Sequence, residues 1–140
     1  MKTIVPVRLL KLALFADAAA SAAIAGLQLV FPALLAERLA LPAVLLTESG
    51  MFLVAYALML VGLASMARVW TAAIQLVIVG NVGWALACLV LAFSPLLSVS
   101  GLGLAFLLLQ AVAVLLFAWI ERAGLQASTA ASPARSHAVA

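Results

Sequence analysis

Asp17 has the clearest capacity for chemistry in this chain, because it interrupts a long apolar stretch. It lies about eight residues into that stretch, or roughly 12 Å from its edge if the stretch is helical. A charged aspartate at the centre of a membrane helix costs about 2.5–3.5 kcal/mol, so Asp17 must face other helices, pair with a donor or stay protonated. Two roles remain open: hydrogen bonding between helices, or coupling to a proton or cation.

Polar residues elsewhere in the apolar sequence could be its partners. Ser21 follows one helical turn after Asp17 and shares its side of the helix. By depth, Gln75 falls near Asp17, whereas Asn81 and Gln110 fall closer to the midplane. Because amides in lipid seek partners on neighbouring helices, we expect these five residues to form one buried polar cluster.

The other chemically interesting residues are isolated. Glu48 falls near the start of the second apolar stretch, where it serves either as a helix-terminal charge or as part of an outward-facing access path; it is a secondary candidate. Cys88 is the single cysteine, His137 is the single histidine, and Tyr56 has the spacing of a packing residue. With no nucleophile, phosphate loop or metal motif, we expect no cofactor, no bound metal and no enzymatic activity.

The composition fixes the broad class. Of the 140 residues 69% are hydrophobic and 8% are charged, whereas a soluble domain carries roughly a quarter charged residues. The net charge of +3 forms no basic run, so nucleic-acid binding is not supported. These numbers exclude a soluble enzyme and indicate an integral membrane protein.

Four apolar stretches are long enough to cross a hydrocarbon core of roughly 30 Å. They cover about residues 9–31, 43–66, 70–93 and 101–120. Backbone groups in lipid must be paired within each segment, so the stretches predict helices, and short links between them predict an antiparallel four-helix bundle. We expect one transmembrane domain over residues 1–122 and a disordered cytoplasmic tail over residues 123–140.

The distribution of basic residues predicts the orientation. If the N-terminus lies inside, six of the seven Lys and Arg residues are cytoplasmic and only Arg38 lies outside. This pattern predicts that both termini face the cytoplasm. Between the first two spans, residues 32–42 form either a short helix in the outer interface or an ordinary loop.

The first span also carries a groove of small residues. Ala18, Ala22 and Gly26 lie on one side of the predicted helix. Small residues at this spacing let another membrane helix approach closely. The expected partners are therefore the lipid bilayer and other transmembrane helices.

About 120 residues carry a resemblance. The stretches LLKLALFADAAASAAIAGL, VIVGNVGWALACLVL and GLAFLLLQAVAVLLFAWIERAGL resemble a common type of uncharacterised bacterial four-helix inner-membrane protein. The resemblance implies a multi-pass protein of the bacterial inner membrane and implies no activity. In size, span number and an acid in the first helix the chain is also similar to small multidrug resistance transporters, although it has Asp17 where they have glutamate.

Two function classes follow from these observations. The first hypothesis is a small non-enzymatic membrane protein, a subunit or accessory and assembly factor that docks other helices. The alternative is a proton-coupled small-molecule transporter that acts as a homo-oligomer, with Asp17 as the coupling carboxylate.

Overall fold

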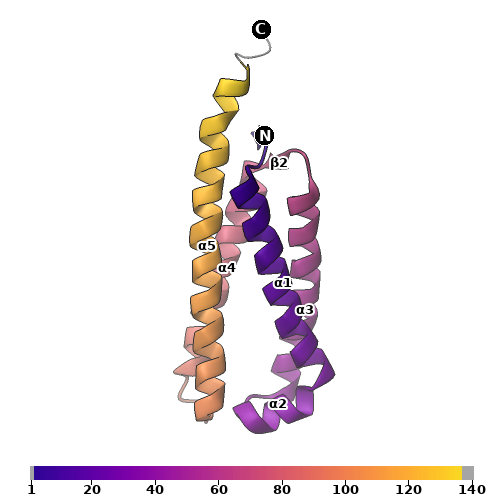
Figure 1. Cartoon of the computed structure of the whole chain (residues 1–140). Coiled ribbons are helices and arrows are strands. Elements are labelled where there is room, and N and C mark those ends of the chain that lie inside the picture. The colour runs from indigo at the N-terminus through magenta and orange to yellow at the C-terminus, as the bar shows by residue number, and fades with distance from the viewer. Residues whose placement is uncertain (1, 137–140) are drawn as a thin grey trace.

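The computed structural model describes residues 2–136, which form five helices and a short two-stranded sheet (Figure 1). The helices are α1 (Arg8–Val30), α2 (Pro32–Leu39), α3 (Ala43–Ser65), α4 (Thr71–Ala92) and α5 (Gly101–Ser136), and the strands are β1 (Thr3–Ile4) and β2 (Val69–Trp70). Helices α1, α3, α4 and α5 are long and apolar enough to cross a membrane. This confirms the predicted all-helical protein with four candidate spans.

The four long helices pack as two pairs. Helix α1 packs along α3, helix α4 packs along α5, and the two pairs meet mainly where α1 touches α5. The start of α1 and the end of α5 lie at one end of the bundle, and α2 lies at the other end (Figure 1). Within the described residues α3 and α4 do not pack closely, although a short link joins them. The two helices meet instead through long side chains, such as Phe52 stacked on Trp84.

The close approach of α1 and α5 depends on Gly124. A Cβ atom at this position would lie 2.9 Å from Cα and Cβ of Leu10, which is closer than carbon atoms can pack. Near the same contact, Ser128 accepts a hydrogen bond of 3.0 Å from the backbone nitrogen of Val7. Ile4, opposite Val69 in the antiparallel sheet, ties the N-terminal strand to the link between α3 and α4.

Helix α5 extends further than the sequence predicted. The fourth span was expected to end near residue 120 and a disordered tail to follow, but α5 is helical to Ser136, and its apolar span reaches Ala131. The physical reason is packing, because Leu125 and Ser128 are buried in the contact with the N-terminal segment. Residues 137–140, including His137, lie outside the described residues.

The linker between the first two spans contains the helix α2. On α2, Leu39 is buried and Leu35 packs against the core, whereas Glu37 and Arg38 are exposed. The backbone oxygen of Leu39 accepts a hydrogen bond of 3.2 Å from the nitrogen of Ser100, just before α5. Helix α2 is thus attached to the start of α5 at one end of the bundle.

We predict that Gly124→Ala destabilises the protein by about 1–3 kcal/mol, because the added methyl group must push α1 and α5 apart. The matched control is Gly62→Ala on α3, where an added Cβ meets no atom within 4 Å. That control should be neutral or slightly stabilising, because alanine is the better helix former. Thermal unfolding in detergent compares the two variants, and equal melting temperatures would contradict the packing described for α1 and α5.

Candidate functional site

Asp17 lies at the centre of a polar cluster in the bundle interior. Its side chain is only 1% exposed. Oδ1 accepts a hydrogen bond of 3.3 Å from Ser21 Oγ on the same helix. Oδ2 lies 2.8 Å from Asn81 Nδ2 on α4 and 3.2 Å from the Tyr56 hydroxyl on α3. Three spans therefore supply neutral groups to one carboxyl group.

The fourth span contributes a second acid, Glu121 on α5. Glu121 is fully buried, and its Oε2 accepts a hydrogen bond of 3.2 Å from Asn81 Nδ2. Its other oxygen, Oε1, is buried with no hydrogen-bond partner among the described residues. The two hydrogens of one amide nitrogen thus reach two different carboxyl groups. Asp17 and Glu121 form a bridged acid pair, with Asn81 as the bridge.

The cluster has fewer donor hydrogens than hydrogen-bond contacts, so it can hold one additional proton. The Tyr56 hydroxyl lies 3.2 Å from Asp17 Oδ2 and 3.1 Å from Asn81 Oδ1. A hydroxyl group has one hydrogen to donate, so it satisfies only one of these two acceptors. If it donates to Asn81, the contact with Asp17 becomes a hydrogen bond when Asp17 carries a proton and donates to Tyr56. A protonated acid pair therefore uses every contact in the cluster.

The position of the cluster follows from the buried faces of the helices. The core consists of two apolar clusters, one containing Leu14, Leu60 and Val77 and the other containing Leu46 and Ala85. On α4, Asn81 comes one turn after Val77 and one turn before Ala85, so it occupies the boundary between the two clusters. The hydrogen-bonded acid pair thus lies between the two apolar clusters.

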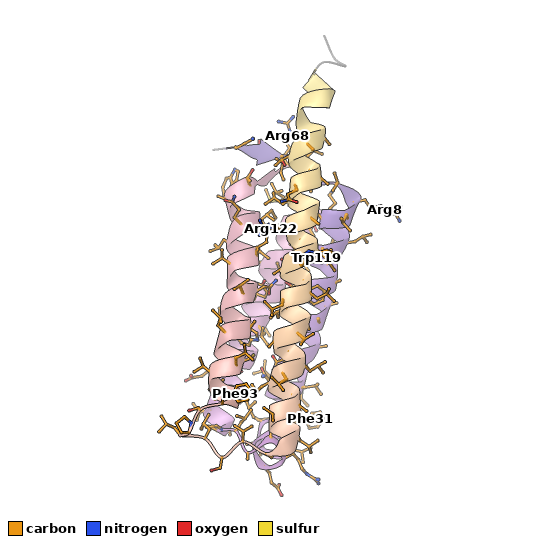
Figure 2. All side chains as sticks on the ribbon, turned by 90° about the vertical axis from the view of Figure 1, so that its left-hand side faces the viewer. Arg8, Phe31, Arg68, Phe93, Trp119 and Arg122 are labelled. Atoms are coloured by element: carbon orange, nitrogen blue, oxygen red, sulfur yellow. The ribbon has the colours of Figure 1, made fainter. Side chains whose placement is uncertain are left out.

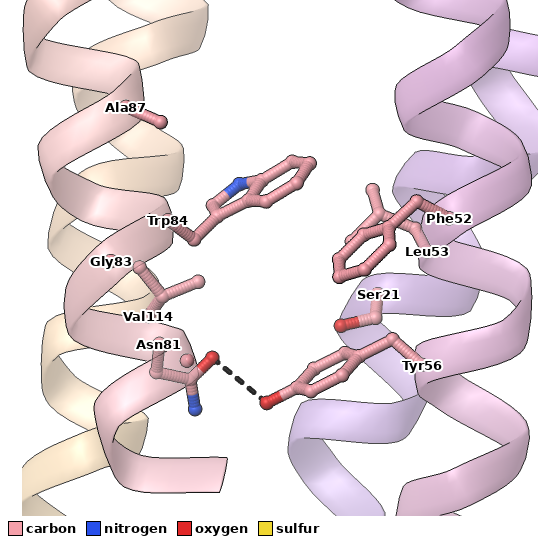
Figure 3. Close-up of a pocket in the computed structure, with 10 residues that line it drawn as sticks. Ser21, Phe52, Leu53, Tyr56, Asn81, Gly83, Trp84, Ala87 and Val114 are labelled. Carbon is pink, nitrogen blue, oxygen red and sulfur yellow. Dashed lines mark hydrogen bonds between the residues drawn. The ribbon is translucent and has the colours of Figure 1, made fainter. Parts of the chain in front are cut away.

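A cavity of about 310 Å³ lies next to this layer, between α3 and α4 (Figure 3). Trp84 on α4 faces Phe52 on α3, with nearly parallel rings whose centroids are 5.7 Å apart. Phe52 also stacks on Tyr56 at 6.2 Å. The cavity is lined by Ser21, Phe52, Leu53, Tyr56, Gly80, Asn81, Gly83, Trp84, Ala87 and Val114. Its walls are aromatic and its polar end is the Tyr56 and Asn81 pair.

Further polar residues line smaller cavities in the interior. Trp84 Nε1 donates a hydrogen bond of 3.4 Å to Gln110 Oε1. A cavity of about 50 Å³ is lined by both Asp17 and Gln110, and one of about 150 Å³ is lined by both Gln110 and Gln28. Polar groups therefore extend from the acid pair toward the end of the bundle that carries α2.

The structure brings together part of the predicted cluster. Asp17, Ser21 and Asn81 are in direct contact, and Gln110 is buried but bonds to Trp84 instead. Gln75 is exposed on α4 and takes no part in the cluster. Asn81, six residues further along α4, is the residue that lies at the level of Asp17. Glu48 is exposed near the N-terminal end of α3.

Sequence reasoning missed Tyr56 and Glu121. Glu121 stands next to Arg122, directly after the predicted end of the fourth span near residue 120. A signal was present in the sequence: Ala118, Glu121, Leu125 and Ser128 recur at helical spacing, and the structure buries all four. The spacing of Tyr56 predicts a packing residue, whereas its hydrogen-bond partners lie on other helices.

Comparison with known proteins gives no assignment. No family model matches the chain, and neither the curated proteins nor the solved structures contain a significant match. Within the described residues, no three His, Cys, Asp or Glu side chains are grouped so that they could hold a metal ion. The functional argument therefore depends on the geometry of the cluster and its cavity.

We predict that Asn81→Leu destabilises the protein by about 1–3 kcal/mol, because both carboxyl groups lose their shared donor in an apolar interior. Gln75→Leu is the matched control on the same helix, and it should be close to neutral because Gln75 is exposed. Unfolding of each variant in mixed detergent micelles measures the difference. Equal loss from both substitutions would contradict a bridging role for Asn81.

Proposed function

We propose that this chain is a proton-coupled small-molecule transporter of the bacterial inner membrane. Asp17 and Glu121 are its coupling pair. The observation that carries the proposal is the contact of two buried carboxyl groups with one amide nitrogen, beside a cavity of about 310 Å³. Cavities of this size bind small molecules in many proteins.

The acid pair is better suited to holding a proton than to joining helices. Burying two negative charges without a cationic partner is costly, and the groups that bond to Asp17 are neutral. Interhelical hydrogen bonding needs no acids, because amides and hydroxyls serve the same purpose. A proton on the pair removes the charge repulsion, and its release restores it. Protonation is thus linked to the distance between α1 and α5.

The two helix pairs are the units that we expect to move. One pair is α1 with α3 and the other is α4 with α5, and they are in close contact mainly through α1 and α5. Asp17 belongs to the first pair, whereas Asn81 and Glu121 belong to the second. Rocking of one pair against the other, as in other transporters, would break or restore the acid pair.

The proposal places the protein with both termini in the cytoplasm. Arg8, Arg68 and Arg122 lie toward one end of the bundle, and Phe31 and Phe93 lie toward the other (Figure 2). Basic residues are retained on the cytoplasmic side. In this orientation the spans form an antiparallel bundle and α2 lies in the outer interface. The bacterial inner membrane is supported by the resemblance described for the sequence.

A subunit or accessory role is the second candidate, and one observation favours it. The outer side of α1 and α3 carries a groove of about 480 Å³, and the small residues Ala18, Ala22 and Gly26 line it. A groove of this kind admits another membrane helix. A second copy in the groove would give the homo-oligomer expected of a small transporter, whereas a helix of another protein would indicate a subunit.

We predict that the acid pair binds one exchangeable proton, visible as a carboxylic C=O band in infrared difference spectra between two pH values. The band should be lost in Asp17→Asn and Glu121→Gln, because each variant removes one member of the pair. In proteoliposomes that contain a lipid-soluble extract of the native membrane, both variants should also fail to discharge an imposed pH gradient.

The control for both measurements is Glu48→Gln, since Glu48 is an exposed carboxyl group. This variant should behave as the wild type. If Asp17→Asn and Glu121→Gln fold normally and still discharge the gradient, the proposed coupling role is wrong.

We predict that Gly26→Leu lowers the oligomeric state of the purified protein, because the larger side chain fills the groove. An added Cβ at Gly26 meets no atom within 4 Å, so the chain itself should still fold. Gly62→Leu is the matched control, as Gly62 has the same free space and does not line the groove. Light scattering in detergent measures the mass. A wild type that is monomeric, but co-purifies in fixed ratio with another membrane protein, would favour the subunit role over the transporter.

A further inference from the structure

The cavity beside the acid pair opens toward the surface that faces lipid. Phe52 is 56% exposed, and Gly83 and Ala87 on the opposite wall are exposed as well. These residues lie on α3 and α4, the neighbouring spans that do not pack closely. Both helices are apolar enough to cross a membrane. A molecule that enters between them would therefore come from the bilayer.

The lining of the cavity favours a flat molecule. Phe52 and Trp84 stack on each other, with ring centroids 5.7 Å apart and an angle of 8° between the rings, so they form one aromatic wall (Figure 3). Gly80 and Gly83 leave part of the α4 side of the cavity without side chains, and a Cβ at either position would meet no atom within 4 Å. Aromatic rings prefer offset-stacked or edge-to-face neighbours, so a planar ring system can lie in this space against the aromatic wall.

The polar end of the cavity carries no charge. Of the residues that line it, the polar side chains besides the Trp84 indole are those of Ser21, Tyr56 and Asn81. Asp17 and Glu121 lie behind them and do not line this cavity. A ligand would thus meet a hydroxyl group and an amide, whereas a cation would find no carboxylate at the wall. This favours a neutral ligand with one hydrogen-bonding oxygen.

We propose that the cavity between α3 and α4 binds a neutral, planar ring molecule that is dissolved in the bilayer, with a single oxygen placed against Tyr56 and Asn81. The inference names the substrate class of the proposed transporter and so rests on the proposed function. It also supplies a link between ligand and proton. The Tyr56 hydroxyl has one hydrogen to donate. If this hydrogen is donated to a ligand oxygen, it is no longer donated to Asp17 or Asn81.

The test uses 2-acetonaphthone as the probe, because it has two fused rings, one carbonyl oxygen and no charge. Its binding to the protein in lipid nanodiscs can be measured by saturation-transfer NMR, with empty nanodiscs as the background. Gly83→Leu should weaken binding at least about tenfold, since the new side chain fills the space between the walls. Gly62→Leu, which lies outside the cavity in equally free space, should leave binding unchanged.

A second probe, N-methylquinolinium, has nearly the same ring system but carries a positive charge. We expect it to bind more weakly than the neutral ketone. Tighter binding of the cation, lost in Asp17→Asn, would overturn the neutral class while leaving the coupling pair intact. Binding of the ketone no stronger than to empty nanodiscs, or equal binding to Gly83→Leu, would also overturn the inference. Failure of the coupling pair is a separate result, because it is read from the infrared band and the gradient discharge.

Discussion

The burial of two carboxyl groups within reach of one amide nitrogen is the constraint on which the rest of the structure depends. Asp17 and Glu121 come from the first and last spans, and Asn81 must stand between them. This arrangement requires α1 and α5 to cross closely, which the missing side chain at Gly124 allows. Apolar clusters lie on either side of the acids. The fold thus holds a costly polar group in one defined place.

The open contact between α3 and α4 is the second feature with functional weight. In a bundle built only for stability, spans joined by a short link would pack together. Here Phe52, Tyr56 and Trp84 stand between them and border a cavity. The acid pair joins α1 and α5, which pack closely, whereas the cavity lies between α3 and α4, which do not. Tyr56 belongs to both, and so it connects a binding space to a proton-holding pair.

Much of this architecture could be predicted from the sequence, because hydropathy alone marks four spans. The polar residue types also indicated that Asp17, Ser21 and Asn81 belong to one cluster. Depth along the helix, however, matched Asp17 with Gln75, which is exposed, whereas Asn81 is the residue on α4 that bonds to Asp17. Glu121 was missed because a charged residue normally ends a span. It remains inside because α5 continues as a helix to Ser136, and Leu125 and Ser128 beyond it are buried. Such contacts depend on which faces meet, and composition carries no information on that.

The most direct test of the shared proton is the carboxyl ¹³C signal of Asp17 in lipid bilayers. Asp17 is the single aspartate of the sequence, so labelling with aspartate gives one resonance, and labelled glutamate adds Glu121 with Glu37 and Glu48. The account predicts that the Asp17 and Glu121 signals change over the same pH interval and that Asn81→Leu separates them. If the Asp17 and Glu121 signals instead change independently of each other in the wild type, the two acids share no proton and the account fails.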